Sequence, residues 1–312
     1  MAYNTSYNIT RSMGEVFSDL MDVLLDIEHD RSQKFTKVIA GFDFGKSDFR
    51  RTLYPQYKGG RSYHLMPEDF QDNYRYELPH LANALGIPVI GTEGVECDDL
   101  IGILVETYNG PEDIVLITGD RDWLQLTIDR PNVTMYDPKQ HREITTECKS
   151  VAQFLVAKTM QGDTSDNIYG VYNCGAVAYN EFVEDAFTDP RSYTGTYEEQ
   201  LEFLFRKFTS FTESNKKYKV HKKYKVIGIE TLEEMFRFNI LLGAIFSDFT
   251  HMTDQQIHGF TLAKNTIATT VPAPISEVQC IVKKIAGTRM SMFGDPVKLP
   301  ADVIDYFHRM HK

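Results

Sequence analysis

The sequence of 312 residues has little cysteine, one tryptophan and no long apolar run. Its four cysteines are scattered without a C-x-x-C pair, which argues against a disulfide framework and against a cysteine-based zinc site. No segment approaches the ~18 consecutive apolar residues that a membrane span requires. The first residues, MAYNTSYNIT, lack the basic and apolar regions of a signal peptide. We therefore expect a cytoplasmic protein that makes no contact with a membrane.

A net positive charge is also absent, because the formal net charge is −11. Total charge thus gives no sign of a nucleic-acid partner. The distribution of charge is more informative, since acids cluster within residues 43–166 while bases cluster in FRRTLYPQYKGGR (49–61) and KKYKVHKKYKV (216–226). If the acids hold metal ions instead of facing solvent, the total misrepresents the surface.

Hydrophobic periodicity predicts an α/β fold whose strands form a parallel sheet. Short apolar strands alternate with amphipathic helices, which is the pattern of βαβ units. The predicted strands are 37–43, 86–93, 113–120 and 133–137, and the predicted helices between and around them are 14–27, 69–85 and 97–108. From about residue 148 the chain reads as mostly helical, with helices at 150–161, 176–187 and 228–247.

Acidic residues follow the predicted strands, at the sheet edge where open α/β sheets bind ligands. Singly, each acid has an ordinary explanation as a turn former, an N-cap or a partner of a helix dipole. Together they place eight carboxylates at one rim, and two unit charges ~4 Å apart repel by about 4 kcal/mol at an effective dielectric of ~20. The eight are Asp43, Glu96, Asp98, Asp99, Asp120, Asp122, Asp163 and Asp166.

Such a carboxylate cluster requires cations in order to remain ionised. Oxygen ligands without histidine or cysteine suit Mg²⁺, or Mn²⁺ in its place, better than zinc. Two or more such ions held by shared carboxylates favour hydrolysis of a phosphodiester bond. The sequence contains no EF-hand loop, P-loop or nucleophile elbow that would favour another chemistry.

Two basic segments are candidates for contact with nucleic acid. In the first, Arg50, Arg51, Lys58 and Arg61 are interleaved with tyrosines such as Tyr57. Arg and Lys suit phosphates and aromatic rings suit unpaired bases, although a solvated basic loop is the simpler alternative. The second segment, residues 216–226, is a further phosphate candidate, but lysine runs of this kind usually form solvated faces.

Four ordered motifs resemble the flap endonucleases of the phage and bacterial 5′-nuclease family, which includes the phage exonucleases and the phage ribonuclease H. They are GFDFGKSDFRRTLYPQYKGGR, TEGVECDDLIG, LITGDRDWLQL and MQGDTSDNIYGV, and FRFNILLGAIF (236–246) adds a weaker match. The resemblance implies a PIN-like parallel-sheet core followed by a helix–three-turn–helix region. It implies a nuclease core at 1–150 with an arch at about 61–85, a DNA-binding helical region at 151–250, and an extension of unknown role at 251–312.

The same resemblance implies an activity and residue roles. The activity is Mg²⁺-dependent 5′-3′ exonuclease or flap-endonuclease cleavage of DNA in replication or repair, including removal of RNA primers. The eight acids match the metal ligands of the family, Lys58 and Arg61 match its catalytic basic pair, and Asn173 and Gly175 lie in its DNA-binding hairpin. A K⁺ ion at the 170–176 hairpin is a further candidate cofactor. The expected partners are DNA with single-stranded or branched 5′ ends, RNA–DNA primers and a single-strand-binding protein or sliding clamp, and the expected state is a monomer.

The chain departs from the family at two places that affect function. NCGAV (173–177) replaces a glycine-rich hairpin and the lysine that follows it; Asn173 can adopt the left-handed conformation, but Val177 cannot bind phosphate. The family also has an earlier strand that ends in a metal-binding Asp, and residues 1–13 offer neither. We expect an upstream reading frame or a separate polypeptide to supply it. The alternative is a structure-specific DNA-binding protein with impaired catalysis.

Overall fold

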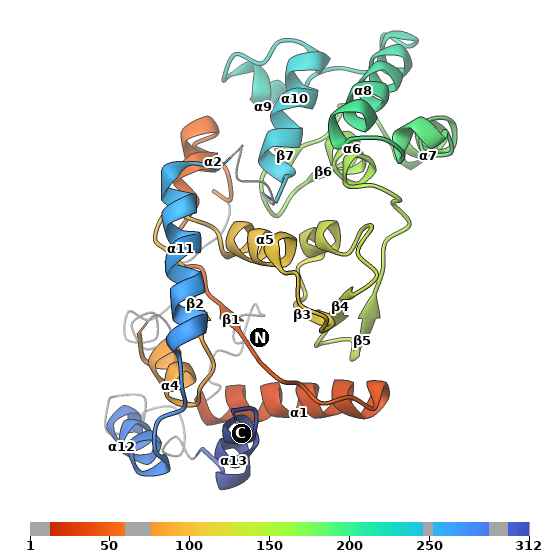
Figure 1. Cartoon of the computed structure of the whole chain (residues 1–312). Helices are drawn as coiled ribbons and strands as arrows, with labels where there is room; N and C mark the ends of the chain where they lie inside the picture. The colour runs from red at the N-terminus through yellow and green to blue at the C-terminus, as the bar shows by residue number, and fades with distance from the viewer. Residues whose placement is uncertain (1–12, 60–75, 246–251, 287–298, 312) are drawn as a thin grey trace.

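The computed structural model describes residues 13–59, 76–245, 252–286 and 299–311. Its first half alternates short strands with helices, as Figure 1 shows. The order is α1 (Met13–Arg31), β1 (Ala40–Gly41), α2 (Asp48–Leu53), α4 (Leu78–Ala84), β2 (Val89–Ile90), α5 (Cys97–Thr107), β3 (Ile114–Ile117), the 3₁₀ helix η3 (Arg121–Leu126), β4 (Val133–Asp137) and β5 (Arg142–Ile144). The part of the predicted helix at 69–85 that precedes residue 76 lies outside the described residues.

The strands form parallel pairs. β1 pairs with β2, with Ala40 opposite Val89, and β3 pairs with β4, with Ile114 opposite Val133. β5 adds an antiparallel edge to β4. Within the described ranges no strand hydrogen-bonds β1 to β3, so the two pairs belong to separate sheets. The predicted α/β class with parallel strands is confirmed.

The second half is mostly helical, also as predicted, and surrounds one small hairpin. Its largest buried side chains include Phe182, Phe208, Tyr224 and Phe236, which pack into a single apolar cluster. The elements are α6 (Val151–Gln161), the hairpin strands β6 (Gly162–Asp163) and β7 (Ile168–Tyr169), α7 (Ala176–Ala186), η4 (Pro190–Ser192), α8 (Tyr197–Glu213), α9 (Lys222–Lys225) and α10 (Leu232–Gly243).

The last part of the described chain returns to the first half of the molecule. α11 (Asp254–Thr269) packs along α5 and β2, where Figure 1 shows it as a long blue helix. α12 (Ile275–Ala286) packs on α4, and α13 (Ala301–Arg309) packs on α1. The rings of Phe17 and Phe307 meet edge to face at 6.3 Å across that last contact. The division of the chain into three domains stays a prediction.

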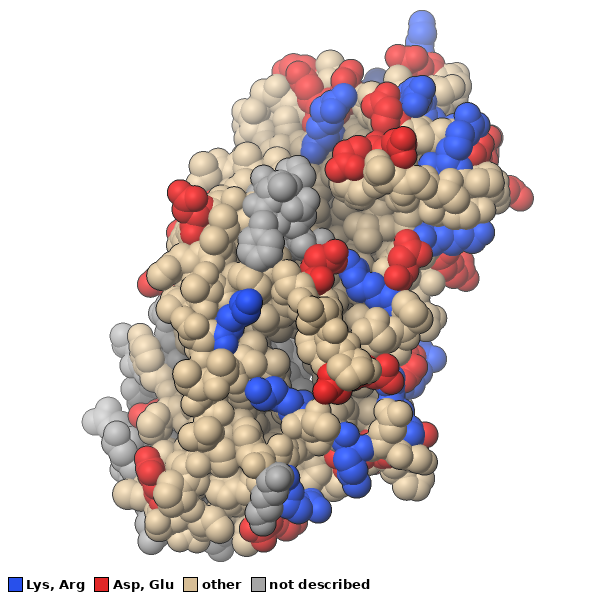
Figure 2. Space-filling view, viewed as in Figure 1, with Lys and Arg blue, Asp and Glu red and all other residues tan. Residues whose placement is uncertain are grey.

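Charges of both signs are interspersed on the face of the molecule drawn in Figure 2. Lys and Arg lie beside Asp and Glu over much of it, above all on the helical part at the upper right. The strong negative net charge therefore does not appear on this face as one continuous acidic field.

None of the described helices is both long enough and apolar enough to cross a bilayer.

Candidate metal and nucleic-acid site

Three of the predicted acids form a compact triad at the junction of the two halves. Asp122, Asp163 and Asp166 each offer a carboxylate oxygen within 4.8 Å of the others. Asp122 lies in η3, directly after β3, whereas Asp163 and Asp166 belong to the β6–β7 hairpin. Oxygen donors without histidine or cysteine are the set that a hard divalent cation prefers. The triad thus fits the predicted kind of metal.

Lys158 lies among these carboxylates. Its ammonium group forms an ion pair with Asp163 at 3.0 Å and another with Asp122. Burial alone lowers the pKa of Lys158, but Asp122 and Asp163 outweigh this effect and raise the pKa above its usual value. The sequence analysis did not identify this residue. A signal exists, because Lys158 is the only charged residue in α6.

The charge state of Asp122 is sensitive to these neighbours. Burial raises its pKa, Lys158 lowers it, and Asp120 and Asp166 raise it again, to a net value of about 6. In Asp163, burial also raises the pKa, but Lys158 and the hydroxyl of Ser165 lower it below the usual value. The triad therefore holds one carboxylate that accepts a proton readily and one that resists it.

A second group of acids surrounds Asp98, at the start of α5. Burial raises the pKa of Asp98 well above its usual value; Lys58 opposes the shift, and the carboxylates of Asp43, Asp120 and Glu96 add to it. The indole Nε1 of Trp123 donates a hydrogen bond of 2.6 Å to Asp98 Oδ1. Like charges this close make a cation favourable here too.

Asp43 and Asp120 are held by the backbone. Asp43 Oδ1 accepts a hydrogen bond of 2.8 Å from the amide of Cys97, at the N-terminus of α5. Asp120 caps η3 by accepting from the amide of Asp122 at 3.0 Å. Both carboxylates act on Asp98, since each raises its pKa.

Lys58 and Tyr57 connect the two acidic groups. The ammonium of Lys58 binds Glu96 and lies 4.0 Å from Asp166 Oδ2. The hydroxyl of Tyr57 lies 3.1 Å from Asp166 Oδ2 and 3.3 Å from Glu96 Oε2. Burial alone lowers the pKa of Lys58, but Glu96, Asp166 and Asp98 raise it above its ordinary value. Lys58 is thus a cation in the centre of the site.

Arg50 and Asp99 form a buried ion pair next to this centre, and Arg50 also binds Glu96. Arg50 was expected to contact DNA and Asp99 to bind metal. Instead, both terminal nitrogens of Arg50 bind Asp99, at 2.8 and 2.9 Å, and Nη1 also binds Glu96. Arg50 donates further to the carbonyls of residues 242 and 244, and Asp99 accepts 2.9 Å from Gln256 Nε2. A buried arginine is the usual counter-ion for carboxylates in the interior, so this pair supports the frame of the site.

The remaining predicted residues occupy different surroundings. Arg51 is exposed on α2. Asn173 is exposed and has a φ of 68°, which confirms its expected left-handed conformation. Gly175 is exposed and forms the N-cap of α7. Arg61 and the first part of the predicted arch lie outside the described residues.

Comparison with known proteins shows which family the sequence resembles. Residues 3–155 match the model of the 5′-3′ exonuclease N-terminal resolvase-like domain. The 5′-3′ exonuclease of Bacillus subtilis is 34% identical over 152 residues, which are 45% of this chain and 49% of that protein. DNA polymerase I of Chloroflexus aurantiacus is 38% identical over 148 residues, 43% of this chain and 15% of that protein. The chain thus spans at most about half the length of these relatives.

A solved structure agrees at the level of the fold. The T5 5′-exonuclease, in a structure with divalent zinc ions, aligns with a TM-score of 0.53 at 19% identity, covering 82% of this chain and 92% of that one. Residues 3–155 therefore resemble the N-terminal domain of the 5′-3′ exonucleases in sequence, and the chain as a whole shares the fold of the T5 5′-exonuclease.

Proposed function

We propose that this protein is a divalent-metal-dependent nuclease that hydrolyses phosphodiester bonds near the 5′ ends of DNA. The observation that carries the proposal is the pair of adjoining acidic groups, one around Asp98 and one formed by Asp122, Asp163 and Asp166, with Lys58 between them. Two such groups with a central cation suit a phosphodiester, whose single negative charge is shared by its two non-bridging oxygens.

The roles of the residues follow from their positions. Asp43, Glu96, Asp98 and Asp120 would hold one ion, and Asp122, Asp163 and Asp166 would hold another; we propose Mg²⁺, because all the donors are carboxylate oxygens. When bound, such ions lower the pKa of coordinated water and stabilise a leaving oxygen. Lys58 contacts the phosphate and offsets its charge, and Tyr57 keeps Glu96 and Asp166 in place through its hydroxyl.

The proposed substrate is DNA with a single-stranded or branched 5′ end, including ends primed with RNA. Support comes from the names of the relatives, a 5′-3′ exonuclease and a DNA polymerase I, which act on DNA. Exposed Arg51 beside the site supplies a basic group for the phosphates of the entering strand.

A cleavage assay with matched variants tests this function. The purified chain is incubated with labelled 5′-flap and 3′-flap DNA in Mg²⁺, Ca²⁺ or EDTA. We expect cutting of the 5′ flap in Mg²⁺, and a loss of about 100-fold or more in Asp120→Asn, because a metal ligand contributes several kcal/mol of charge stabilisation. Asp129→Asn is the control, since Asp129 is exposed and its φ of 57° suits Asn equally well. Tight flap binding without cleavage, unchanged by Asp120→Asn, would instead identify a DNA-binding protein.

A further inference from the structure

Trp123 links η3 to the start of α5 at the candidate metal site. It follows Asp122 in η3, and its indole Nε1 donates a hydrogen bond of 2.6 Å to Oδ1 of Asp98, 25 residues earlier in the chain. The two elements also pack against each other. A side chain of η3 therefore binds a predicted metal ligand that belongs to another element.

The ring of Trp123 is held by packing as well as by this hydrogen bond. It is half-buried and lies against the apolar cluster that includes Ile101 of α5 and Leu124 of η3. Indole N–H groups in such surroundings usually have a hydrogen-bond partner. Because packing limits the orientations that the ring can adopt, its N–H group has a defined direction, toward Asp98.

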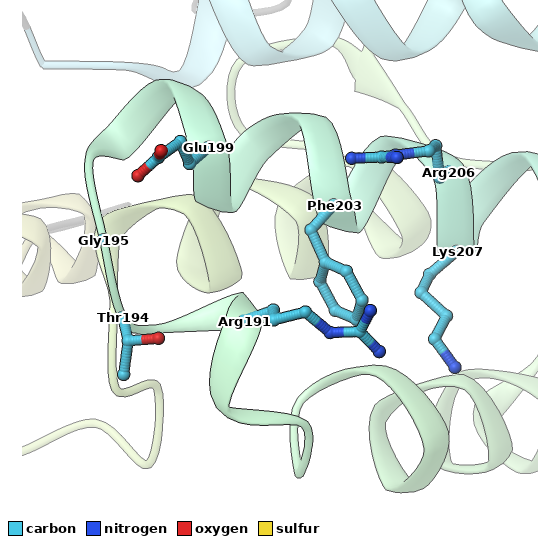
Figure 3. Close-up of a pocket in the computed structure, with 7 residues that line it drawn as sticks. All are labelled: Arg191, Thr194, Gly195, Glu199, Phe203, Arg206 and Lys207. Carbon is cyan, nitrogen blue, oxygen red and sulfur yellow. The ribbon is translucent and has the colours of Figure 1, made fainter.

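Elsewhere in this chain, ion pairs neutralise acids. Arg191 and Lys207 line the hollow between η4 and α8 that is drawn in Figure 3. Arg191 forms an ion pair with Asp189 at 2.7 Å. Lys207 forms an ion pair with Asp185 at 2.8 Å. Such a pair cancels the negative charge of the carboxylate, so a further cation gains little by binding there.

Asp98 differs from these acids because the donor that binds it is neutral. Within the described ranges, Trp123 is the only residue that donates a hydrogen bond to the Asp98 carboxylate, and no cation forms an ion pair with it. Lys58 lies close enough to lower the pKa of Asp98, but its ammonium group binds Glu96. An indole N–H carries no charge, so it orients the carboxylate and leaves the negative charge for an ion.

We propose that Trp123 is a positioning residue for a divalent ion bound by Asp98. The hydrogen bond to Oδ1 limits rotation of the carboxylate and leaves Oδ2 available to the ion. Groups that orient a metal ligand in this way contribute about 10–100-fold to metal affinity. The inference rests on the proposed function for the presence of an ion at Asp98, although ion binding is measured separately from cleavage.

The test removes the N–H group of Trp123 and keeps the shape of the ring. Because Trp123 is the only tryptophan, expression in a tryptophan auxotroph supplied with benzothienylalanine puts sulfur in place of this N–H alone. 5-Fluorotryptophan, which retains the N–H, is the matched control. Binding of Mn²⁺ in the absence of DNA is measured by electron paramagnetic resonance of the free ion. We expect the sulfur analogue to bind Mn²⁺ about 10–100-fold more weakly at one site, and the fluorinated protein to bind it as the wild type does.

A second background shows whether the indole acts through Asp98. In Asp98→Ala, which lacks the accepting carboxylate, the sulfur analogue should cause no further loss of Mn²⁺ affinity. A further loss of the same size in that background would overturn the inference, because the indole would then act through another group. Unchanged Mn²⁺ affinity of the sulfur analogue, or a wild type that binds no Mn²⁺, would also overturn it.

Separate outcomes distinguish this inference from the proposed function. A wild type that cuts 5′-flap DNA in Mg²⁺, with a sulfur analogue that binds Mn²⁺ normally, would support the nuclease and refute the role of Trp123. A wild type that cuts nothing, but whose Mn²⁺ affinity depends on the N–H group, would do the reverse. Circular dichroism and the melting temperature in EDTA check that both analogues are folded, as expected for rings of nearly equal volume.

Discussion

Lys158 Nζ lies 3.0 Å from Asp163 Oδ2 and also binds Asp122, so a protein cation lies between two carboxylates of the triad. In the absence of metal this ammonium offsets the repulsion among three acids. The metal site is thus partly neutralised by the chain itself.

Replacing Lys158 should make the fold depend more strongly on divalent metal. We expect Lys158→Met to unfold more easily in EDTA by about 3 kcal/mol, because it leaves buried carboxylates without a counter-ion. Mg²⁺ should restore a larger part of the melting temperature in the variant than in the wild type. Thermal melts with and without Mg²⁺ measure this, and Lys158→Arg, which keeps the charge, is the control. Equal responses to Mg²⁺ in all three proteins would contradict the role given to Lys158.

Asp122 should weaken the fold at neutral pH when no metal is present. Its pKa is about 6 in the folded chain, above the ordinary value of 3.8, so its ionised form destabilises the folded state. The penalty grows as the pH rises from about 4 to 6 and is complete above that range. At pH 7.5 in EDTA, Asp122→Asn should therefore raise the free energy of unfolding by about 1–3 kcal/mol. Urea titrations at pH 7.5 and pH 4 check this; the gain should be absent at pH 4 and absent in Asp129→Asn at both.

Binding of Mg²⁺ should weaken below pH 6. A proton on Asp122 must leave before the carboxylate can coordinate an ion, so the apparent affinity should fall by up to about tenfold per pH unit below 6 and level off above 7. Trp123 is the only tryptophan and donates to Asp98, which makes its fluorescence a reporter of the neighbouring site. A Mg²⁺ titration of that fluorescence from pH 5 to 8 gives the profile. An affinity independent of pH would rule out the raised pKa of Asp122.

Arg50 and Arg51 are adjacent in sequence, but substitution of Arg50 should lower the stability of the fold, whereas substitution of Arg51 should leave it nearly unchanged. Arg50→Met removes the counter-ion of Glu96 and Asp99 and should cost about 3–5 kcal/mol of stability. Arg51→Met changes an exposed side chain and should alter stability by no more than ~0.5 kcal/mol, while weakening DNA binding if Arg51 contacts phosphate. Chemical denaturation compares the two, and similar stabilities would exclude the interior role of Arg50.

The helix α11 should support the site through Gln256. This side chain donates to Asp99 and its Oε1 accepts from the amide of Thr253, so Gln256→Ala leaves buried groups without partners and should cost about 1–3 kcal/mol. His258→Ala, on the exposed face of the same helix, should be close to neutral. Denaturation measures both; a neutral Gln256→Ala would show that α11 does not support Asp99.

Local chemistry in the sequence was enough for the fold class, and it predicted acids after the strands whose roles stay predictions. Strands such as IVLI and helices with apolar residues at helical spacing are specified by neighbours along the chain, and acids placed after strands converge because parallel strands end at one edge. The left-handed conformation of Asn173 was likewise a local property. The helices, the strands and the conformation of Asn173 are local, whereas the convergence of the acids needs contacts between distant segments, such as the bond from the amide of Cys97 to Asp43.

Only the tertiary structure decided which partners each of two similar residues has. Asp98 and Asp99 are neighbours in the first turn of α5, yet they have different surroundings. Asp98 interacts with Asp43 and Asp120. Asp99 instead binds Arg50 and Gln256. The role of Lys158 likewise depends on its contact with Asp122, which is 36 residues away in sequence. The sequence determines the charges and the local geometry, whereas packing determines each charge's partner, because electrostatic interaction depends on distance and burial and not on order along the chain.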